Sequence, residues 1–384
     1  MKVAVLGCGT VGGGVYTLLR QTPGLEPGPV LVRPGKECLP FHVSSFAALL
    51  DDPAVEAVVE AIGGVEPAYS YAKAALSAGR HFVTANKALV AAHGPELDAL
   101  ARTHHVAFLF SAACGGGVPF PHNLALAAQS DRILVLGGIL NGTTNFMLDR
   151  IQTQGIDYSA ALAQAQALGY AEADPTADVS GLDAQRKLAL ACAVAYGRLP
   201  REGFALEGIE SLTLADAAHF QSLGLTCRLM AKAGRTDSGA LFAVVEPTLL
   251  PPGHPACCVA LNGNLAYYEG SAAGTITLLG QGAGRWPTAS AVLRDLTGIA
   301  QGQRHQLPEG CTVCRAENQD LHRQYYVRCS PELAAELPVA AVLREDGAVR
   351  LRTKPMPVPE LHRIIGEGRK AGQSVFFAGI EETV

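Results

Sequence analysis

The feature that most constrains this chain is the glycine pattern Gly7-x-Gly9-x-x-Gly12 near its N-terminus. It directly follows a short apolar run rich in valine, residues 2–6, and it precedes the apolar segment VYTLLR. In the order strand, glycine turn, helix, Gly7 allows a tight turn, Gly9 lets a diphosphate approach the backbone, and Gly12 permits close packing of the helix. The pattern predicts a dinucleotide site at a helix N-terminus, with a purely structural glycine turn as the alternative.

Short apolar segments and helical patterns alternate as far as about residue 110. Strands are predicted at residues 29–32, 57–62, 81–85 and 106–110, and helices at residues 46–50, 67–78 and 94–102. Alternation at this spacing indicates a parallel sheet covered by helices on both faces. We therefore expect an α/β fold that begins with a Rossmann-type dinucleotide-binding domain.

After about residue 122 the pattern changes to a sheet-plus-helices arrangement of α+β type. Strands are predicted at residues 132–140, 239–248, 256–261, 264–268 and 274–279, and helices at residues 157–168, 181–196 and around 214–233. The last segment, residues 324–380, has the order βαββαβ. We expect an NAD(P)-binding domain at residues 1–122 with a returning helix at 285–302, a catalytic and dimerisation domain at 123–284, and a small tail at 306–384.

The choice of nucleotide is read at the end of the second predicted strand. An NAD enzyme places an acidic residue there to bind the ribose 2′-hydroxyl. This chain has V-R-P-G-K instead, with Arg33 and Lys36. Two cations suit the 2′-phosphate of NADP through charge-assisted hydrogen bonds. NADP is the predicted cofactor; NAD, with the two cations merely solvated, is the alternative.

Two further clusters follow predicted strands of the first domain, at the edge where open α/β sheets bind ligands. Lys87, in the run Thr84-Ala85-Asn86-Lys87, could contact the cofactor or carry a proton, or it could be a surface charge. The run Cys114-Gly115-Gly116-Gly117-Val118 suggests close approach by a ligand or by another backbone. Carbonyl groups in such a turn can also ligate a hard cation, and a flexible linker is the alternative.

Two clusters in the second domain contain polar groups suited to a small ligand. Asn141 and Thr143 follow an apolar strand and could bind an amino-acid-like molecule or cap the next helix. Asp183 and Lys187 are four residues apart on a predicted helix, which places a carboxylate and an ammonium on one face. A lysine beside carboxylates could exchange a proton with a carbinol, whereas a surface pair would contribute only about 0.2–0.5 kcal/mol.

Composition excludes two other classes of protein. The net charge of −5 and a sequence pI of about 6.1 do not fit a basic nucleic-acid-binding surface. The longest uncharged stretch, residues 106–130, contains three glycines and two prolines and is a poor membrane helix. The N-terminus has no targeting pattern. We expect a soluble, cytoplasmic protein.

These clusters, in this order, resemble homoserine dehydrogenase across nearly the whole of residues 1–302. The matching stretches are G-x-G-x-V-G-x-G, EAIGG, TANKAL, GGGVP, GILNGTTNFML, LGYAEADPTADVSGLDAQRKLALA and GAGRWPTASAVLRDL. The resemblance implies NAD(P)-dependent interconversion of L-homoserine and L-aspartate 4-semialdehyde in threonine and methionine biosynthesis, by a homodimer. Rival hypotheses are a related dehydrogenase acting on aspartate or another semialdehyde, and a nucleotide sensor without catalysis.

The resemblance also implies roles for individual residues. Lys187 would be the principal acid and base, with Lys87 completing the proton path, and Asp183 and Glu172 would hold the amino and hydroxyl groups of the substrate. The cofactor would be lined by Thr10, Val11, Thr84, Gly169, Glu172 and Gly282. Backbone carbonyls of Cys114, Gly116 and Val118 would bind a structural monovalent cation, usually sodium.

Three parts of the chain depart from the family pattern. The segment between the first helix and the strand at Ala57 is shorter than in the family. The family usually has a glutamate ahead of the glycine run, where this chain has Ser111, so one cation ligand is missing. The βαββαβ tail resembles an ACT regulatory domain in its order of elements, but the usual glycine-rich effector turn is not evident.

Overall fold

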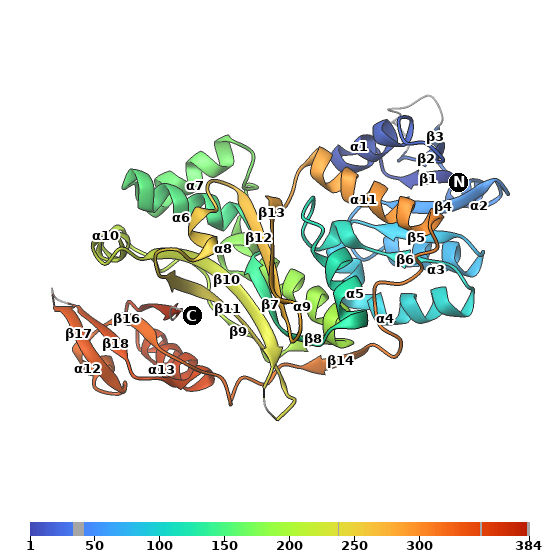
Figure 1. Cartoon of the computed structure of the whole chain (residues 1–384). Coiled ribbons are helices and arrows are strands. Elements are labelled where there is room, and N and C mark those ends of the chain that lie inside the picture. The colour runs from blue at the N-terminus through green and yellow to red at the C-terminus, as the bar shows by residue number, and fades with distance from the viewer. Residues whose placement is uncertain (34–41, 237, 346–347, 382–384) are drawn as a thin grey trace. The chain divides into compact units, whose positions relative to one another are not determined.

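The computed structural model describes residues 1–33, 42–236, 238–345 and 348–381 and divides into two compact units. Unit 1 comprises Met1–Ile133, Ala189–Arg201 and Tyr268–Cys314, and unit 2 comprises Leu134–Leu188, Glu202–Tyr267 and Arg315–Val384. Figure 1 labels the elements of both units. The division into three domains expected from the sequence stays a prediction.

Unit 1 contains a parallel sheet with the strand order β3-β2-β1-β4-β5-β6. This is the order of the doubly wound dinucleotide-binding fold, so the predicted Rossmann-type sheet is confirmed. The strands are β1 (Lys2–Leu6), β2 (Glu26–Leu31), β3 (His42–Val43), β4 (Val55–Glu60), β5 (His81–Thr84) and β6 (Phe108–Leu109).

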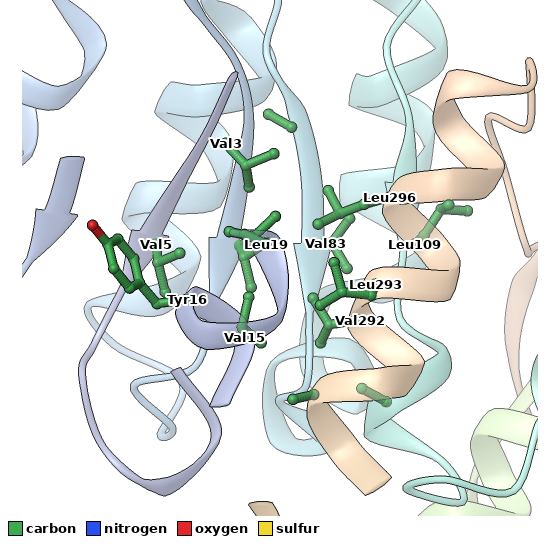
Figure 2. Close-up of a cluster of buried hydrophobic side chains, with 14 of the residues drawn as sticks. Val3, Val5, Val15, Tyr16, Leu19, Val83, Leu109, Val292, Leu293 and Leu296 are labelled. Carbon is green, nitrogen blue, oxygen red and sulfur yellow. The ribbon is translucent and has the colours of Figure 1, made fainter. Parts of the chain in front are cut away.

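Helices of unit 1 pack against this sheet and against one another. They are α1 (Thr10–Leu19), α2 (Phe46–Leu50), α3 (Ala68–Ser77), α4 (Lys87–Thr103), α5 (Phe120–Ser130) and α11 (Arg285–Ala300), with a 3₁₀ turn η1 (Ser111–Ala113). Helix α11 lies beside α1 although the two are far apart in sequence. Their apolar faces, with Val15, Leu19, Val292 and Leu296, form one buried cluster with Val3 and Val5 of β1 (Figure 2).

Helix α4 begins earlier than the predicted residue 94. The side chain of Asn86 caps it by accepting from the Leu89 backbone N–H, so Lys87 is the first helical residue. Pro95 lies inside the helix and cannot donate to the carbonyl of Ala91. The guanidinium of Arg201 donates to that carbonyl and to the carbonyl of Ala92, which satisfies the group that the proline leaves without its usual partner.

Unit 2 is built on a sheet whose strands run in the order β12-β7-β10-β11-β20-β16-β18-β17. Its first part consists of β7 (Ile133–Ile139), β10 (Thr226–Arg235), β11 (Leu241–Leu250) and β12 (Gly263–Gly270), with β9 (Ala205–Leu206) beside β11. The helices are α6 (Gly142–Gln154), α7 (Tyr158–Ala167), α8 (Thr176–Val179), α9 (Leu182–Tyr196) and α10 (Leu214–Ser222).

The C-terminal segment follows the predicted order βαββαβ. Its elements are β16 (Tyr325–Cys329), α12 (Pro331–Ala334), β17 (Val339–Glu345), β18 (Val349–Thr353), α13 (Val358–Lys370) and β20 (Phe376–Ile380), with a two-residue strand β19 (Met356–Pro357) that pairs with β15 (His322–Arg323). Strand β20 runs parallel to β11, which joins this segment to the sheet of unit 2. The apolar face of α13 packs on the segment's own buried cluster.

Two predicted elements are wrong. The helix expected around 214–233 ends at Ser222, and Thr226–Arg235 forms β10 instead. Gly224 has a φ of +69°, a conformation that ends a helix, and antiparallel pairing with β11 then overrides the helical pattern. The strand expected at 256–261 begins as a 3₁₀ turn, η2 (Pro255–Cys258), whose proline has no N–H for a sheet ladder.

Strand β13 (Gly274–Gln281) pairs with β12 at the edge of the large sheet, and β8 (Arg198–Glu202) pairs with β14 (Thr312–Arg315) in a separate two-stranded sheet. Among the helices of the described residues, none is long and apolar enough to cross a bilayer.

Candidate active site

The glycine turn between β1 and α1 has the geometry that the sequence predicts. Gly7 has a φ of +95°, which L side chains rarely adopt. A Cβ at Gly12 would lie 2.0 Å from the carbonyl oxygen of Gly7, so only glycine lets the helix pack this closely on the turn. A Cβ at Gly9 would meet nothing within 4 Å, which leaves open space above this residue. The three glycines therefore serve a turn, a packing contact and an open approach to the backbone.

The start of α1 is available for an anion. Its N-cap residue is Gly9, so no side chain caps the helix, and Thr10 and Val11 follow as the first two helical residues. Uncapped N–H groups at the positive end of a helix dipole bind phosphate readily. These residues fit the diphosphate of a dinucleotide.

The residues predicted to select the nucleotide are described only in part. Arg33 is exposed and lies two residues beyond the end of β2. Lys36 lies outside the described residues. The preference for NADP therefore stays a prediction, supported by one exposed cation at the expected end of the strand.

A buried glutamate organises the carboxyl edge of β4 and β5. Glu60, the last residue of β4, is fully buried and accepts from the backbone N–H groups of Ile62 and Gly63 and from the hydroxyl of Thr84. The Thr84 hydroxyl in turn accepts from the backbone N–H of Asn86. Since this hydroxyl is fully engaged, only the main chain of Thr84 would remain to line a nucleotide.

Glu60 was not predicted as a site residue, although the sequence carried a signal for it. A carboxylate at the end of the apolar strand VEAVVE is unusual, because buried carboxylates need several donors. Here the donors come from the loop after β4 and from the end of β5, so Glu60 fixes two loops at the edge where α/β sheets bind ligands. Lys87 begins the helix that leaves this edge.

The glycine run after β6 is approached by another backbone. A Cβ at Gly116 would lie 2.2 Å from the carbonyl oxygen of Gly282, and the N–H of Gly117 donates to the carbonyl of Gln281 at 3.0 Å. Close backbone approach, one of the two reasons considered for this run, is therefore present. It brings Gly116 together with Gly282, which the family resemblance places in the nucleotide site.

A monovalent cation fits the turn at Cys114, Gly116 and Val118 poorly. The carbonyl of Val118 already accepts from the N–H of Phe120 at 2.8 Å. Ser111, which stands in place of the family's glutamate, donates its hydroxyl to Asp295 at 2.6 Å and also accepts from the side chain of Gln306. Position 111 therefore supplies no carboxylate ligand to a cation.

Asp295 should make the stability of unit 1 depend on pH. Burial raises the pKa of its carboxyl to about 7, although hydrogen bonds from Ser111 favour the charged form. A buried acid with a raised pKa holds a proton that the unfolded chain releases at lower pH. Its contribution to the free energy of unfolding should therefore fall as the pH rises from about 4 to about 7, by up to about 1.4 kcal/mol per pH unit. Urea unfolding of Asp295→Asn across this range should show a flatter pH dependence than the parent protein, and identical pH profiles would contradict the assignment.

In unit 2 the candidate residues gather where β7 leads into α6. The side-chain oxygen of Asn141 caps α6 by accepting from the backbone N–H of Thr144 at 2.8 Å. Its amide nitrogen donates to Asp178 at 2.7 Å and to Asp183 at 2.8 Å. Asn141 therefore caps the helix, as the alternative reading expects, and also binds two carboxylates of the polar cluster, while its binding to a ligand stays a prediction. Its amide protons are used within the protein, so its role is to position the two carboxylates.

The predicted pair on α9 is present. The Nζ atom of Lys187 lies 2.8 Å from Asp183, and the two side chains are 12% and 7% exposed. Lys187 also donates to the carbonyl of Leu140 at 2.8 Å. A nearly buried ion pair with a second backbone acceptor has a fixed geometry, unlike a solvated surface pair. The ammonium group is thus held at the end of β7, beside Asn141.

Asp178 is a further member of this cluster. Burial raises the pKa of its carboxyl, and repulsion from Asp183 raises it further, while the amide of Asn141 and the charge of Lys187 lower it. Asp178 and Asp183 thus share one amide donor, the side chain of Asn141. Asp178 was not predicted as a site residue.

The other predicted substrate residues differ in how they are bound. A side-chain hydrogen bond with Thr143 also lowers the pKa of Asp178, so Thr143 belongs to the same network. Thr143 donates its hydroxyl to the carbonyl of Tyr170 at 2.6 Å, which ties α6 to the loop after α7. Glu172 and Gly169 lie in that loop and are exposed. Within the described part of the chain, the Glu172 carboxylate forms no hydrogen bond. It is therefore available to a ligand, and its role stays a prediction.

Unit 1 thus has an uncapped helix start that suits an anion, and unit 2 has a lysine held by a carboxylate and a backbone carbonyl. A fixed amine in such surroundings can give a proton to, or take one from, an oxygen during a carbonyl–carbinol reaction. A dinucleotide-binding fold and a fixed amine are what a nicotinamide-dependent oxidoreductase acting on a CH–OH group requires.

Comparison with known proteins agrees with this assignment. Residues 7–111 match the NAD-binding domain of homoserine dehydrogenase, and residues 119–297 match the homoserine dehydrogenase family. The homoserine dehydrogenase of Synechocystis sp. is 40% identical over 316 residues, covering 78% of this chain and 73% of that protein. That of Corynebacterium glutamicum is 41% identical over 323 residues, covering 79% and 72%.

Solved structures show the same likeness. The crystal structure of a homoserine dehydrogenase from Thiobacillus denitrificans matches with a TM-score of 0.87 and 30% identity, covering 100% of this chain and 98% of that one. A hyperthermophilic archaeal homoserine dehydrogenase in complex with NADPH matches in fold, with a TM-score of 0.67 and 24% identity over 79% of this chain and 98% of that one. This chain belongs to the homoserine dehydrogenase family.

Proposed function

We propose that this protein interconverts L-homoserine and L-aspartate 4-semialdehyde with NADP as the preferred nucleotide. The observation that carries the proposal is Lys187, held at 2.8 Å from both Asp183 and the carbonyl of Leu140. A solvent-facing lysine would have many rotamers, whereas this one presents its amine in one place. Membership of the family indicates which substrate to expect. The site residues provide the proton donor and acceptor that the reaction requires.

The proton chemistry is carried by Lys187. In the direction of reduction, its ammonium group donates a proton to the aldehyde oxygen, which becomes the hydroxyl of homoserine. In the direction of oxidation, the neutral amine takes that proton back. A bound nicotinamide would supply or accept the hydride at the carbon that bears this oxygen. Asp183 stabilises the charged lysine, and Asn141 keeps Asp183 in place through its amide.

Substrate recognition would involve acidic residues of the same unit. Asp183 and the exposed Glu172 would bind the amino and hydroxyl groups of homoserine, because carboxylates accept from ammonium and hydroxyl donors. Asn141 and Thr143 would keep this wall rigid, since their side chains are bound to Asp178, Asp183 and the carbonyl of Tyr170. Lys87, at the start of α4, would complete the proton path.

The nucleotide would lie on the turn of Gly7, Gly9 and Gly12. Its diphosphate would meet the uncapped start of α1, with Thr10 and Val11, and its 2′-phosphate would meet Arg33 and Lys36. The main chain of Thr84, Gly282, Gly169 and Glu172 would line the remainder. This assignment rests on the open space above Gly9 and on the family resemblance.

Three broader features belong to the same proposal. The protein would act as a cytoplasmic homodimer formed through the catalytic domain. Its βαββαβ segment would be an ACT-like domain, which the element order supports. A sodium ion at Cys114, Gly116 and Val118 would be structural, and the engaged hydroxyl of Ser111 argues for weak binding there.

The substrate assignment is tested by following NADPH oxidation with aspartate 4-semialdehyde and with other amino-acid semialdehydes in parallel. The proposal predicts rapid oxidation with aspartate 4-semialdehyde and little with the others. Preferential turnover of another semialdehyde would indicate a sister dehydrogenase. Tight NADPH binding without turnover of any of these compounds would indicate a nucleotide sensor.

A further inference from the structure

Arg285, the first residue of α11, lies against the first turns of α1. A Cβ built on Gly14 would lie 3.0 Å from Cγ of Arg285, and one on Gly13 would lie 3.7 Å from its guanidinium nitrogen Nη2. The same position at Gly13 is 3.8 Å from the carbonyl oxygen of Cys8, within the glycine turn. The arginine therefore extends over the side of α1 that Gly13 and Gly14 leave bare, toward the turn itself.

This contact places two helix starts side by side. Gly14 is also next to Ala289, one turn into α11, so α1 and α11 begin at the same end of unit 1. Neither helix has a side-chain cap: the N-cap residues are Gly9 and Gly284. Both helix dipoles therefore contribute positive potential here, and the guanidinium of Arg285 adds a full charge.

The charge of Arg285 is not neutralised by an ion pair among the described residues. The residue is exposed, and no carboxylate of the described residues pairs with it. Its guanidinium lies 4.8 Å from the centre of the Trp286 ring, a cation–π contact that limits its rotamers without neutralising it. An oriented, uncompensated cation beside two uncapped helix starts is complementary to an anion with more than one charge.

We infer that Arg285 binds the diphosphate of the nicotinamide nucleotide beside the glycine turn. The inference rests on the proposed nucleotide site at Gly7, Gly9 and Gly12. The diphosphate is common to NAD and NADP, whereas Arg33 and Lys36 would face the 2′-phosphate that only NADP carries. Arg285 therefore contributes to the affinity for both nucleotides and does not discriminate between them.

The chain provides its own reporter of binding. Trp286 is the only tryptophan in the sequence and is 51% exposed, next to Arg285. Reduced nicotinamide absorbs where tryptophan emits, so titration with NADPH or NADH should quench Trp286 fluorescence as the nucleotide binds. This readout needs no substrate and no turnover.

The test compares Arg285→Ala with the parent protein by titrating each with NADPH and, separately, with NADH. Loss of a charge-assisted hydrogen-bond donor should weaken both nucleotides by about ten-fold or more, and by similar factors. The affinity of the variant should also depend less on salt. Arg285→Lys should recover part of the affinity, because it keeps the charge but not the planar fork.

A matched control is Arg20→Ala, which removes an exposed arginine from the other end of α1 and changes the net charge equally. It should bind both nucleotides as the parent protein does. Unchanged affinity in Arg285→Ala, with its circular dichroism also unchanged, would overturn the inference, and so would a loss confined to NADPH. A parent protein that binds neither nucleotide would overturn the proposed function as well, which separates the two failures.

Discussion

Replacing Lys187 with alanine is expected to reduce turnover by about a hundred- to ten-thousand-fold, the usual contribution of a positioned acid or base. The reason is that Lys187 presents its amine between Asp183 and the carbonyl of Leu140, each at 2.8 Å. Alanine leaves no group there to exchange a proton with the substrate oxygen. Nucleotide affinity should be unchanged, because Lys187 is not among the residues proposed to bind the nucleotide. Steady-state kinetics and a Trp286 titration measure the two properties separately.

The matched control for this variant lies on the same helix. Arg186 is the preceding residue of α9, carries the same charge and is exposed. Arg186→Ala should therefore turn over at nearly the rate of the parent protein. Turnover in folded Lys187→Ala equal to that in Arg186→Ala would show that Lys187 is not the proton carrier, and the ion pair with Asp183 would then be structural.

The second large effect is expected from two substitutions in the glycine turn. Both should abolish nucleotide binding, but for different reasons. Alanine at Gly9 meets nothing within 4 Å, so the protein should fold normally, but its methyl group fills the space that a diphosphate would use. Alanine at Gly12 meets the Gly7 carbonyl oxygen at 2.0 Å, so it should lower the free energy of unfolding by about 1–3 kcal/mol or more. Gly9→Ala should lose nucleotide binding with its stability intact, and Gly12→Ala should lose both.

Denaturant unfolding and nucleotide titration of the two variants distinguish this account from a purely structural turn. Gly24→Ala is a useful reference, because Gly24 has a φ of +79° and a Cβ there meets nothing, so alanine strains the backbone without touching the turn. If Gly9→Ala bound NADPH as tightly as the parent protein, the space above Gly9 would not be the diphosphate site.

The parts of the fold predicted from sequence are those set by local patterns. The strand, glycine turn and helix at Gly7–Gly12 depend on neighbours in the chain, and the pair of Asp183 and Lys187 depends only on helical spacing. Where pairing between distant segments decides the structure, local patterns gave a wrong prediction. The segment after Gly224 has a helical pattern, yet it forms β10 and pairs with β11 over ten residue pairs.

The parts of the site that sequence could not show are contacts between distant residues. Ser111 and Asp295 are 184 positions apart, and only the return of α11 to unit 1 brings them together. Glu60 and Thr84 meet because β4 and β5 are neighbours in the sheet, which fixes what the Thr84 hydroxyl can do. Arg285 is one of many exposed arginines in the sequence, and only its contact with Gly13 and Gly14 gives it a role.

The most direct test of the central claim is the absorbance of reduced nicotinamide when the purified protein is mixed with L-homoserine and NADP or NAD. The account predicts a rise that requires homoserine, is faster with NADP, and is lost in Lys187→Ala. A folded protein that binds the nucleotides but gives no rise with either of them would contradict it.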